Sequence, residues 1–429
     1  MKTTHAQAAP MRALRPWQLV WLAAAVFGIS AGYGALLPQW QGWMSILNPG
    51  ATATAVSRHI GLLSGMYTAG VLVGAPLWGM LADRVGLGRV LIFGLVGYVA
   101  SLFVMLVPEF QTLWGIYALR AATGFFVAAV VPVVSALVAE HTPQVQRARR
   151  FAWLGAMSLL GFLFGPALNI AARRAGRWVE GGTTSAAVTA QAVIVLSAIF
   201  GAVMMFGLMR TLPERIVAPV SVPKDGPSVP TGFTALLWLS GAVTFVLSAF
   251  ELGIVLQGQL HTGTSPREVA MMFALCALTM LAVNTLLFFT ALLDKVPARR
   301  VVVTGLLLAV VGLTVLAFHH SNAWMYAGIS FTSVGTGLIL PVIAYRAAGA
   351  SRDRLGKTMG GLAAAAGLGQ TLGAAVGGWL FGAEAQTTFA WLAVPLIGIF
   401  AILLARPTWG SEVPDGSPPQ FRRRSTSPS

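Results

Sequence analysis

Charged residues are scarce in this sequence. Of its 429 residues only 10% are charged, whereas 56% are hydrophobic, and the mean hydropathy is +0.76. A soluble protein carries roughly 25% charged residues. So much apolar surface has no water-soluble packing, and we therefore expect an integral membrane protein whose solvent is the lipid bilayer.

Cysteine and catalytic motifs are also lacking. Cys276 is the only cysteine, so no disulfide can form within the chain. We find no nucleotide-binding loop, no metal-binding cluster and no nucleophile beside a general base. The adjacent His319 and His320 fall at the end of an apolar run and are better explained as loop residues than as a metal site. We therefore expect no enzyme, no cofactor and no metal.

Acidic residues are outnumbered by basic ones, and the net charge is +15. The basic residues are scattered over many short loops, which argues against a nucleic-acid partner. In a membrane protein they indicate loops that face the cytoplasm and anionic lipid headgroups.

Long apolar runs fill the remainder of the chain. A helix needs roughly 20 apolar residues to cross the hydrocarbon core. We predict twelve spans: 17–38, 59–82, 89–107, 112–138, 151–172, 187–209, 232–256, 269–293, 300–318, 323–345, 358–382 and 387–405. The first run is too long for a signal peptide, so we expect it to remain as the first span.

A proline-rich stretch separates the sixth span from the seventh. It contains five prolines together with charged residues, which is typical of a flexible linker. We therefore divide the chain into a cytoplasmic tail (1–16), a first six-helix bundle (17–210), a cytoplasmic linker (211–231), a second six-helix bundle (232–405) and a disordered cytoplasmic tail (406–429).

The distribution of basic residues predicts the orientation. With the N-terminus inside, the inner loops and tails hold 22 of the 28 Lys and Arg residues, and the outer loops hold five. The positive-inside rule then places both termini in the cytoplasm. Arg173, Arg174 and Arg177 depart from this rule, but cations suit the carboxyl end of a helix. We expect a monomer in the inner membrane of a bacterium.

A charged pattern occurs twice. Asp83 and Arg84 are followed by Arg89, and 211 residues later Asp294 and Lys295 are followed by Arg300. In both copies an acid precedes a base, and another base stands six positions after the acid. Each copy links two hydrophobic segments. Matched hinges on one face of two halves are typical of a transporter built from parallel repeats.

The first copy resembles the signature of the major facilitator superfamily, G-x-L-A-D-R-x-G-x-[RK]-[RK]. It matches at Gly79, Leu81, Ala82, Asp83, Arg84, Gly86 and Arg89, and departs from it at Gly88. The resemblance implies an all-α membrane fold of two pseudo-symmetric six-helix bundles. It also implies that Asp83 meets the start of the eleventh span near Lys357 and closes the cytoplasmic side. The alternative is that these charges only anchor the topology.

Two further motifs resemble the drug:proton antiporter branch of that superfamily. Arg120 and Gly124 fit its R-x-x-x-G element, and Gly161, Gly165 and Pro166 fit a helix-packing motif associated with antiport. The glycine pair that closes the second motif is missing, since Asn169 and Ile170 stand there. This departure weakens the inference of antiport.

Two charged residues fall inside predicted spans. Arg120 lies nine residues into span 112–138, roughly 13 Å deep. A buried arginine is costly, so it faces either an anion or proton relay, or a structural partner. Glu251 is the only acid inside a span away from its ends. It either carries the transported proton or lies in the outer headgroup region.

The remaining candidates for substrate or proton coupling are polar residues of the first, seventh and tenth spans, which line the cavity in the family. They are Tyr33, Ser248 and Thr336. The first span has no acid, unlike that of many multidrug antiporters.

The sequence predicts a secondary transporter of a small organic molecule, working by alternating access and exporting it in exchange for protons. Proton-coupled uptake of an organic anion is an alternative that Arg120 would suit. A remote alternative is a membrane receptor or scaffold without transport.

Overall fold

The computed structural model describes residues 14–142, 144–182, 185–212, 233–260, 266–289, 296–318, 321–350 and 355–405. All regular elements within these ranges are helices. Those of the first half are α1 (Pro16–Leu36), η1 (Leu37–Gln39), α2 (Trp40–Leu47), α3 (Ala53–Val85), α4 (Leu87–Val104), η2 (Pro108–Phe110), α5 (Leu113–Val127), α6 (Val131–Glu140), α7 (Gln144–Glu180) and α8 (Ala186–Thr211). Those of the second half are α9 (Phe233–Leu260), α10 (Pro266–Phe289), α12 (Ala298–Ala317), α13 (Asn322–Ala350), α14 (Leu355–Glu384), η3 (Ala385–Thr387) and α15 (Thr388–Ala405).

Eleven helical segments of the described ranges are long and apolar enough to cross a membrane. They coincide with eleven of the predicted spans. The other predicted span, 358–382, forms α14, whose glycines and Gln370 make it less apolar. With 30 residues, α14 is roughly 45 Å long and still exceeds the ~30 Å of a hydrocarbon core. The all-α membrane fold predicted from the sequence is therefore confirmed.

Two spans differ in shape from the prediction. Span 112–138 is divided, because α5 ends at Val127 and α6 begins at Val131. Pro132 is the second residue of α6, a position where a missing amide hydrogen costs no helical hydrogen bond. The fifth span is longer than predicted, since α7 continues to Glu180. Arg177 therefore lies in its last turn.

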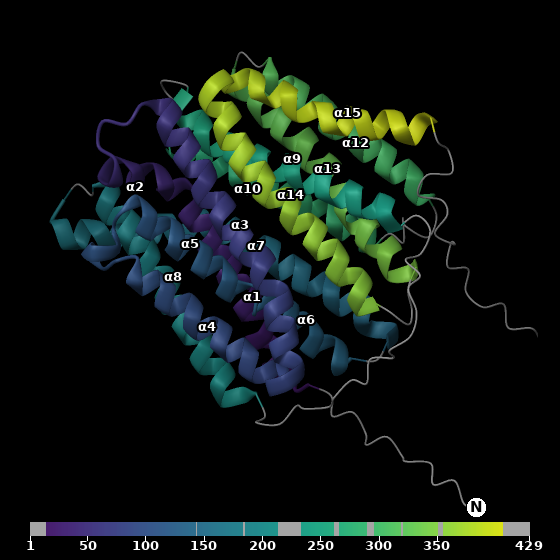
Figure 1. The fold of residues 1–429 in the computed structure, drawn as a ribbon, viewed down its shortest axis with the longest axis horizontal. Helices are drawn as coiled ribbons and strands as arrows, with labels where there is room; N and C mark the ends of the chain where they lie inside the picture. The colour runs from purple at the N-terminus through teal and green to yellow at the C-terminus, as the bar shows by residue number, and fades with distance from the viewer. Residues whose placement is uncertain are drawn as a thin grey trace, which may run out of the picture.

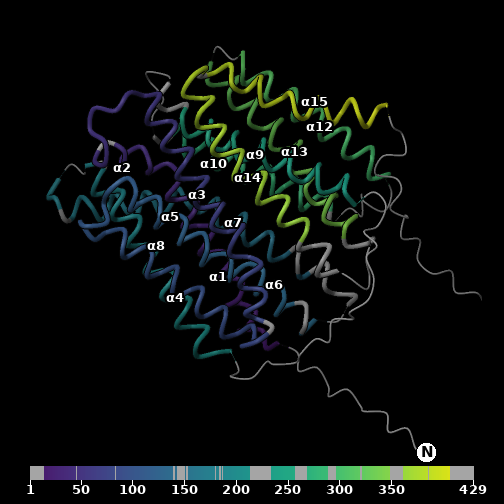
Figure 2. The backbone as a smooth tube through the Cα atoms, in the orientation of Figure 1, coloured from purple at the N-terminus to yellow at the C-terminus, as the bar shows by residue number. Residues whose placement is uncertain are grey.

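The two halves lie side by side, with α3 of the first half packed along α14 of the second (Figure 1). The backbone trace in Figure 2 shows the same pairing of early and late parts of the chain. Glycines permit this close approach. A Cβ atom on Gly61 would lie 2.6 Å from the Cα of Gly378 and 2.7 Å from the carbonyl oxygen of Ala374. The two helices thus meet backbone to backbone.

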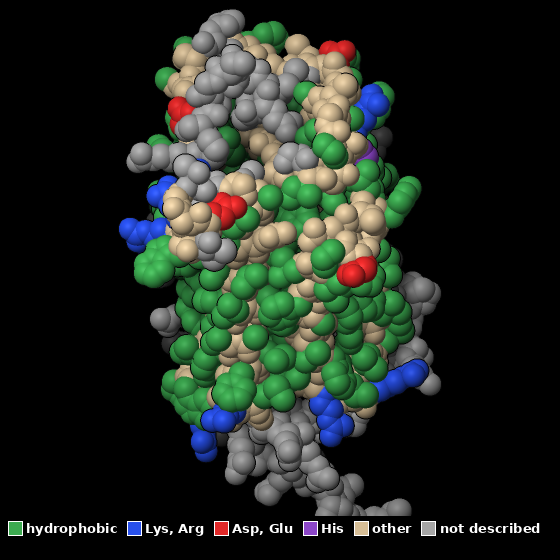
Figure 3. All heavy atoms as spheres, turned by 90° about the vertical axis from the view of Figure 1, so that its left-hand side faces the viewer, with side chains coloured by type: hydrophobic (Ala, Val, Ile, Leu, Met, Phe, Trp, Pro, Cys, Tyr) green, Lys and Arg blue, Asp and Glu red, His purple; other side chains and the backbone are tan. Residues whose placement is uncertain are grey.

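The outer surface carries a broad hydrophobic band (Figure 3). In that view basic side chains border the band below, whereas acidic and basic side chains lie above it. Large apolar side chains on this surface, such as Phe93, Phe206 and Trp391, are more than half exposed. In a bilayer these side chains face acyl chains rather than water.

Candidate functional site

Arg120 of α5 is enclosed between two aromatic rings. Its side chain is 1% exposed. The guanidinium carbon lies 4.8 Å from the ring centroid of Trp40 and 4.5 Å from that of Tyr67. Both distances are within the range of a cation–π interaction, which is strongest for desolvated groups. The Nε atom of Arg120 has no hydrogen-bond partner among the described residues.

Glycines of α3 and α5 position this arginine. A Cβ atom on Gly124 would overlap the carbonyl oxygen of Tyr67, and one on Gly70 would overlap that of Ala121. Small residues therefore bring the two helix backbones into direct contact. Tyr67 lies at this contact, so its ring is held beside the guanidinium of Arg120. Arg120 lies one helical turn before Gly124 on α5. The R-x-x-x-G spacing thus has a packing explanation in this chain.

Tyr33 of α1 connects the two charged residues. Its ring centroid lies 5.0 Å from that of Tyr67 and 6.2 Å from that of Phe162. Arg120 and Glu251 both influence the electrostatic surroundings of the Tyr33 hydroxyl. Tyr33 belongs to the first half and Glu251 to the second, so the two halves approach each other here. The aromatic row continues to the second half through Phe273 of α10, whose ring centroid is 5.7 Å from that of Phe162.

Glu251 lies among interior helices. It is partly buried on α9, between the fully buried Phe250 and Leu252. Its carboxylate is close enough to Tyr33 and to Cys276 of α10 to affect their electrostatic surroundings. Within the described part of the chain we find no hydrogen bond to this carboxylate. Glu251 is therefore a partly buried acid within the apolar segment Phe233–Leu256, near Tyr33 of the other half.

The other polar candidates differ in what they contact. Ser248 is partly buried three residues before Glu251, and so lies on the same face of α9. Thr336 is 1% exposed, and its hydroxyl donates to the carbonyl oxygen of Thr332 in its own helix at 2.9 Å. The Ser333 hydroxyl donates to the Sγ of Cys276 at 3.1 Å. Of these residues, Ser248 is the one placed beside the acid.

The signature loop joins α3 to α4 through a single residue. Gly86 has φ +94° and ψ 146°, a conformation that side chains other than glycine disfavour. Arg84 and Arg89 are exposed on either side of it. Asp83 lies in the last turn of α3, where its side chain is not described, and a Cβ on Gly79 would meet open space.

The second copy of the charged pattern is only partly described. Asp294 and Lys295 lie outside the described residues, and Arg300 is exposed at the start of α12. The neighbouring Arg299, which the sequence did not single out, donates from Nη2 to the carbonyl oxygen of Leu403 at 2.6 Å. This bond ties α12 to α15.

Gly161 and Gly165 lie where α7 crosses α1. A Cβ atom on Gly161 would overlap the carbonyl oxygen of Phe27, and one on Gly165 would lie 2.6 Å from the carbonyl carbon of Gly34. Pro166 follows inside α7. Asn169, which replaces the first glycine of the missing pair, accepts a hydrogen bond from Gln39 and donates to the carbonyl oxygen of Ala35 at 3.0 Å. At this departure from the motif, Asn169 thus adds hydrogen bonds that join α7 to α1 and η1.

The halves are joined tightly at the end opposite the signature loop. There the Gln41 side chain donates to the carbonyl oxygen of Val255 at 2.8 Å. A Cβ on Gly382 would lie 2.9 Å from the carbonyl oxygen of Thr54. We call this region, formed by Gln41, Thr54, Gly61, Val255 and Gly378, the sealed end. Sequence reasoning missed it, although the glycines of α14 were a usable signal.

No group of three or more His, Cys, Asp and Glu side chains that could hold a metal ion occurs in the described ranges.

Comparison with known proteins assigns the fold to a family. The Major Facilitator Superfamily model matches residues 20–283 and 237–428. The quinolone resistance protein NorA of Staphylococcus aureus (strain COL) is 24% identical over 386 residues, covering 89% of this chain and 94% of that protein. The class B tetracycline resistance protein of Escherichia coli is 31% identical over 138 residues, covering 32% of this chain and only 33% of that protein.

Solved structures agree with this fold. The human organic anion transporter MFSD10 (TETRAN) has a TM-score of 0.69 at 18% identity, covering 91% of this chain and all of that one. An auto-inhibited peptide transporter of the POT family has a TM-score of 0.70 at 15% identity, covering 91% and 97%. The family model spans both halves, and the chain therefore belongs to the Major Facilitator Superfamily of membrane transporters.

Proposed function

We propose that this transporter exports a small, largely apolar organic molecule in exchange for protons. The observation that carries the proposal is Glu251, an acid without a described hydrogen-bond partner that lies near Tyr33 of the other half. Intramembrane acids of transporters commonly relay protons. The resemblance to tetracycline and quinolone resistance proteins supports a drug-like substrate.

Competition at one carboxylate would couple the two fluxes. Protonated Glu251 is neutral and tolerates an apolar surrounding, whereas ionised Glu251 attracts a cationic or hydrogen-bond-donating group of the substrate. If the two occupants exclude each other, substrate leaves when a proton arrives. The rings of Tyr33, Phe162 and Phe273, which contact one another in that order, would supply an apolar wall for the substrate.

Arg120 has a different role in this proposal. Two rings cover its guanidinium, so an anionic substrate would have to displace one of them before reaching the charge. Arg120 instead sets the electrostatic environment of Tyr33 and holds α2, α3 and α5 together. This arrangement argues against an organic anion as the substrate, and hence against the alternative of organic-anion uptake.

Gradient-driven transport tests the proposal. Purified protein in liposomes with an acidic lumen would be offered tetracycline, a fluorescent quinolone and an organic anion as probes. We expect gradient-dependent accumulation of a drug probe, lost on addition of a protonophore and in Glu251→Gln. Glu109→Gln, an exposed acid of η2, is the matched control and keeps it. Drug accumulation that does not depend on the proton gradient would exclude proton coupling. Accumulation of the anion alone, in liposomes whose exterior rather than lumen is acidic, would favour proton-coupled uptake.

The orientation belongs to the proposal as well. We infer that the sealed end faces outside and that the signature loop faces the cytoplasm. The tails 1–16 and 406–429 and the linker 211–231 would then be cytoplasmic. The bundles 17–210 and 232–405 would lie in the inner membrane, and the working unit would be a monomer. In a Cys276→Ala background, a cysteine at Glu109 should react with an impermeant thiol reagent in intact cells. One at Ser228 should not react, and the reverse pattern would overturn the orientation.

We further propose that the signature loop governs closure of the cytoplasmic side. Asp83 ends α3, where the helix dipole repels a carboxylate, so it needs a partner such as the start of α14. Loss of one charge-assisted hydrogen bond costs about 1–3 kcal/mol. Asp83→Asn should therefore leave the protein in the membrane and slow transport at least fivefold. Transport at the wild-type rate and expression level would rule out this role.

A further inference from the structure

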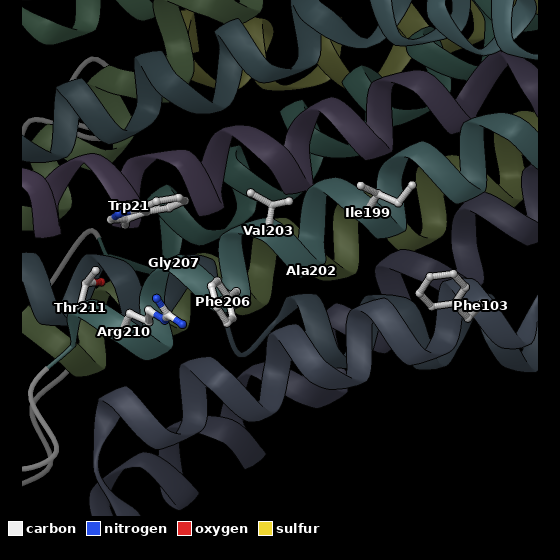
Figure 4. Close-up of a pocket in the computed structure, with 9 residues that line it drawn as sticks. All are labelled: Trp21, Phe103, Ile199, Ala202, Val203, Phe206, Gly207, Arg210 and Thr211. Atoms are coloured by element: carbon white, nitrogen blue, oxygen red, sulfur yellow. The ribbon is translucent and has the colours of Figure 1, made fainter.

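A surface groove on the first half is lined almost wholly by apolar residues. It lies between α1, α4 and α8 and has a volume of about 550 Å³. None of its lining residues belongs to the candidate site around Arg120 and Glu251. Figure 4 shows its lining: Trp21, Phe103, Ile199, Ala202, Val203, Phe206, Gly207, Arg210 and Thr211. Ile199, Val203 and Phe206 are 49%, 51% and 55% exposed, so the groove opens toward the bilayer.

The floor of the groove depends on one glycine. A Cβ on Gly207 would lie 2.6 Å from the Cδ2 atom of Trp21, so only glycine lets the indole lie across α8 at this point. The side chain of Gln18, one turn before Trp21, donates to the carbonyl oxygen of Thr211 at 2.8 Å. The Gln18 hydrogen bond fixes α1 against the end of α8. The absence of a side chain at Gly207 leaves the groove open.

Charge is concentrated at one end of the groove. Arg210 is the sole charged residue among the nine that line it, and it is exposed in the last turn of α8. Its guanidinium carbon lies 4.4 Å from the ring centroid of Phe206. Arg15, three residues before Gln18 and also exposed, lies toward the same end. Arginine pairs with phosphate through two parallel hydrogen bonds.

The length of the groove matches one leaflet. Ile199 and Arg210 are eleven residues apart on α8, which corresponds to about 16 Å along the helix. Half of a ~30 Å hydrocarbon core is about 15 Å. An acyl chain laid along Val203 and Ile199 would therefore end near the bilayer midplane while its phosphate remains beside Arg210.

We propose that this groove binds one anionic phospholipid, with an acyl chain between α4 and α8 and the phosphate on Arg210. An aromatic residue near a basic one at the membrane–water boundary suits such a headgroup, and Arg210, the arginine that lines the groove, contributes roughly a fivefold preference for anionic lipid. Because none of its lining residues belongs to the candidate transport site, we expect its occupancy not to depend on the transported molecule.

Photo-crosslinking tests the site directly. Full-length purified protein would be delipidated and incubated with phosphatidylglycerol that carries a diazirine in its acyl chain, and the crosslinked peptides would be mapped. We expect crosslinks concentrated in residues 199–211. Unlabelled phosphatidylglycerol should compete about fivefold better than phosphatidylcholine. Equal competition by the two lipids, or crosslinks spread evenly over the exposed helices, would overturn the proposal.

Two variants and two matched controls separate charge from shape. Arg210→Gln should abolish the preference for phosphatidylglycerol, whereas Arg174→Gln, an exposed arginine near the other end of the membrane, should retain it. Val203→Trp fills the groove and should lower crosslinking at least fivefold. Val394→Trp, on an exposed position of α15, should not. A full lipid preference in Arg210→Gln, with the protein monodisperse on size exclusion, would refute the role of the phosphate contact.

Discussion

Arg120 and Glu251 are both charged residues placed inside a membrane protein, yet their surroundings are opposite. Arg120 is enclosed, and the rings of Trp40 and Tyr67 lie 4.8 and 4.5 Å from its guanidinium carbon. Glu251 is partly accessible and has no hydrogen-bond partner among the described residues. An enclosed charge cannot readily gain or lose a proton or a bound group, whereas a partly accessible charge can exchange a proton for a substrate group. We therefore assign the first a fixed electrostatic and packing role, and the second the exchange of protons and substrate.

Removing the enclosed charge should have the largest effect. Arg120→Ala leaves a void between Trp40 and Tyr67 and removes two cation–π contacts, together worth about 2 kcal/mol or more when desolvated. We expect a lower thermal midpoint and loss of both gradient-driven transport and substrate exchange. Fluorescence-detected size exclusion after heating, together with both transport assays, measures this.

Arg120→Lys is the companion variant, because it keeps the charge and loses the planar guanidinium. It should recover part of the stability and of the exchange rate. If Arg120→Ala exchanges substrate at the wild-type rate, the enclosed charge is dispensable and the contrast between the two sites has no functional meaning.

Neutralising the accessible charge should have a narrower effect. Glu251→Gln preserves shape and hydrogen-bonding capacity but can neither release nor bind a proton. We expect gradient-driven transport to vanish while downhill exchange persists within about threefold of wild type, which a change near 0.6 kcal/mol in a membrane hydrogen bond allows. Proton-driven transport retained in full by Glu251→Gln would remove this acid from the mechanism.

The sequence predicted the membrane fold because a bilayer forces each span to be a helix of about 20 apolar residues. It also placed Arg120 and Glu251 inside predicted spans, and the two residues lie within α5 and α9. It could not predict the partners of Arg120, since Trp40 and Tyr67 are 80 and 53 positions away and meet it only through the packing of α2, α3 and α5. The break after Val127 was missed although Pro132 follows it closely.

Polar residues were the least predictable part of the site. Serine and threonine in a span bond either to their own helix or into a cavity, and the sequence does not distinguish the two. Thr336 and Ser248 stood as equal candidates. The structure separates them, since Thr336 is enclosed and bonded to Thr332, whereas Ser248 shares a face with Glu251.

A smaller effect is expected from the ring that covers Arg120. Tyr67→Leu removes an aromatic face from the guanidinium and from Tyr33, whose ring centroid is 5.0 Å away. The cost should be about 1–2 kcal/mol, seen as a lower thermal midpoint with transport reduced but present. Tyr67→Phe retains the ring and is the matched control, expected near wild type. Equal loss in both variants would mean that the hydroxyl, and not the ring, is what matters.

The smallest effects should come from Ser248 and Thr336, and their order tests whether accessibility separates functional from structural polar groups. The Ser248 hydroxyl lies three residues from Glu251 and makes no hydrogen bond with a described residue, so it is free to bind substrate. Ser248→Ala should therefore raise the substrate KM about threefold, which corresponds to the ~0.6 kcal/mol of a typical membrane hydrogen bond. Thr336→Val is close to isosteric and removes only a bond to the carbonyl of Thr332. It should leave KM unchanged and shift the thermal midpoint slightly. Drug-dependent exchange, titrated over substrate concentration in both variants, decides between these outcomes. A larger KM change in Thr336→Val than in Ser248→Ala would show that the enclosed hydroxyl, rather than the one beside the acid, contributes to the binding site.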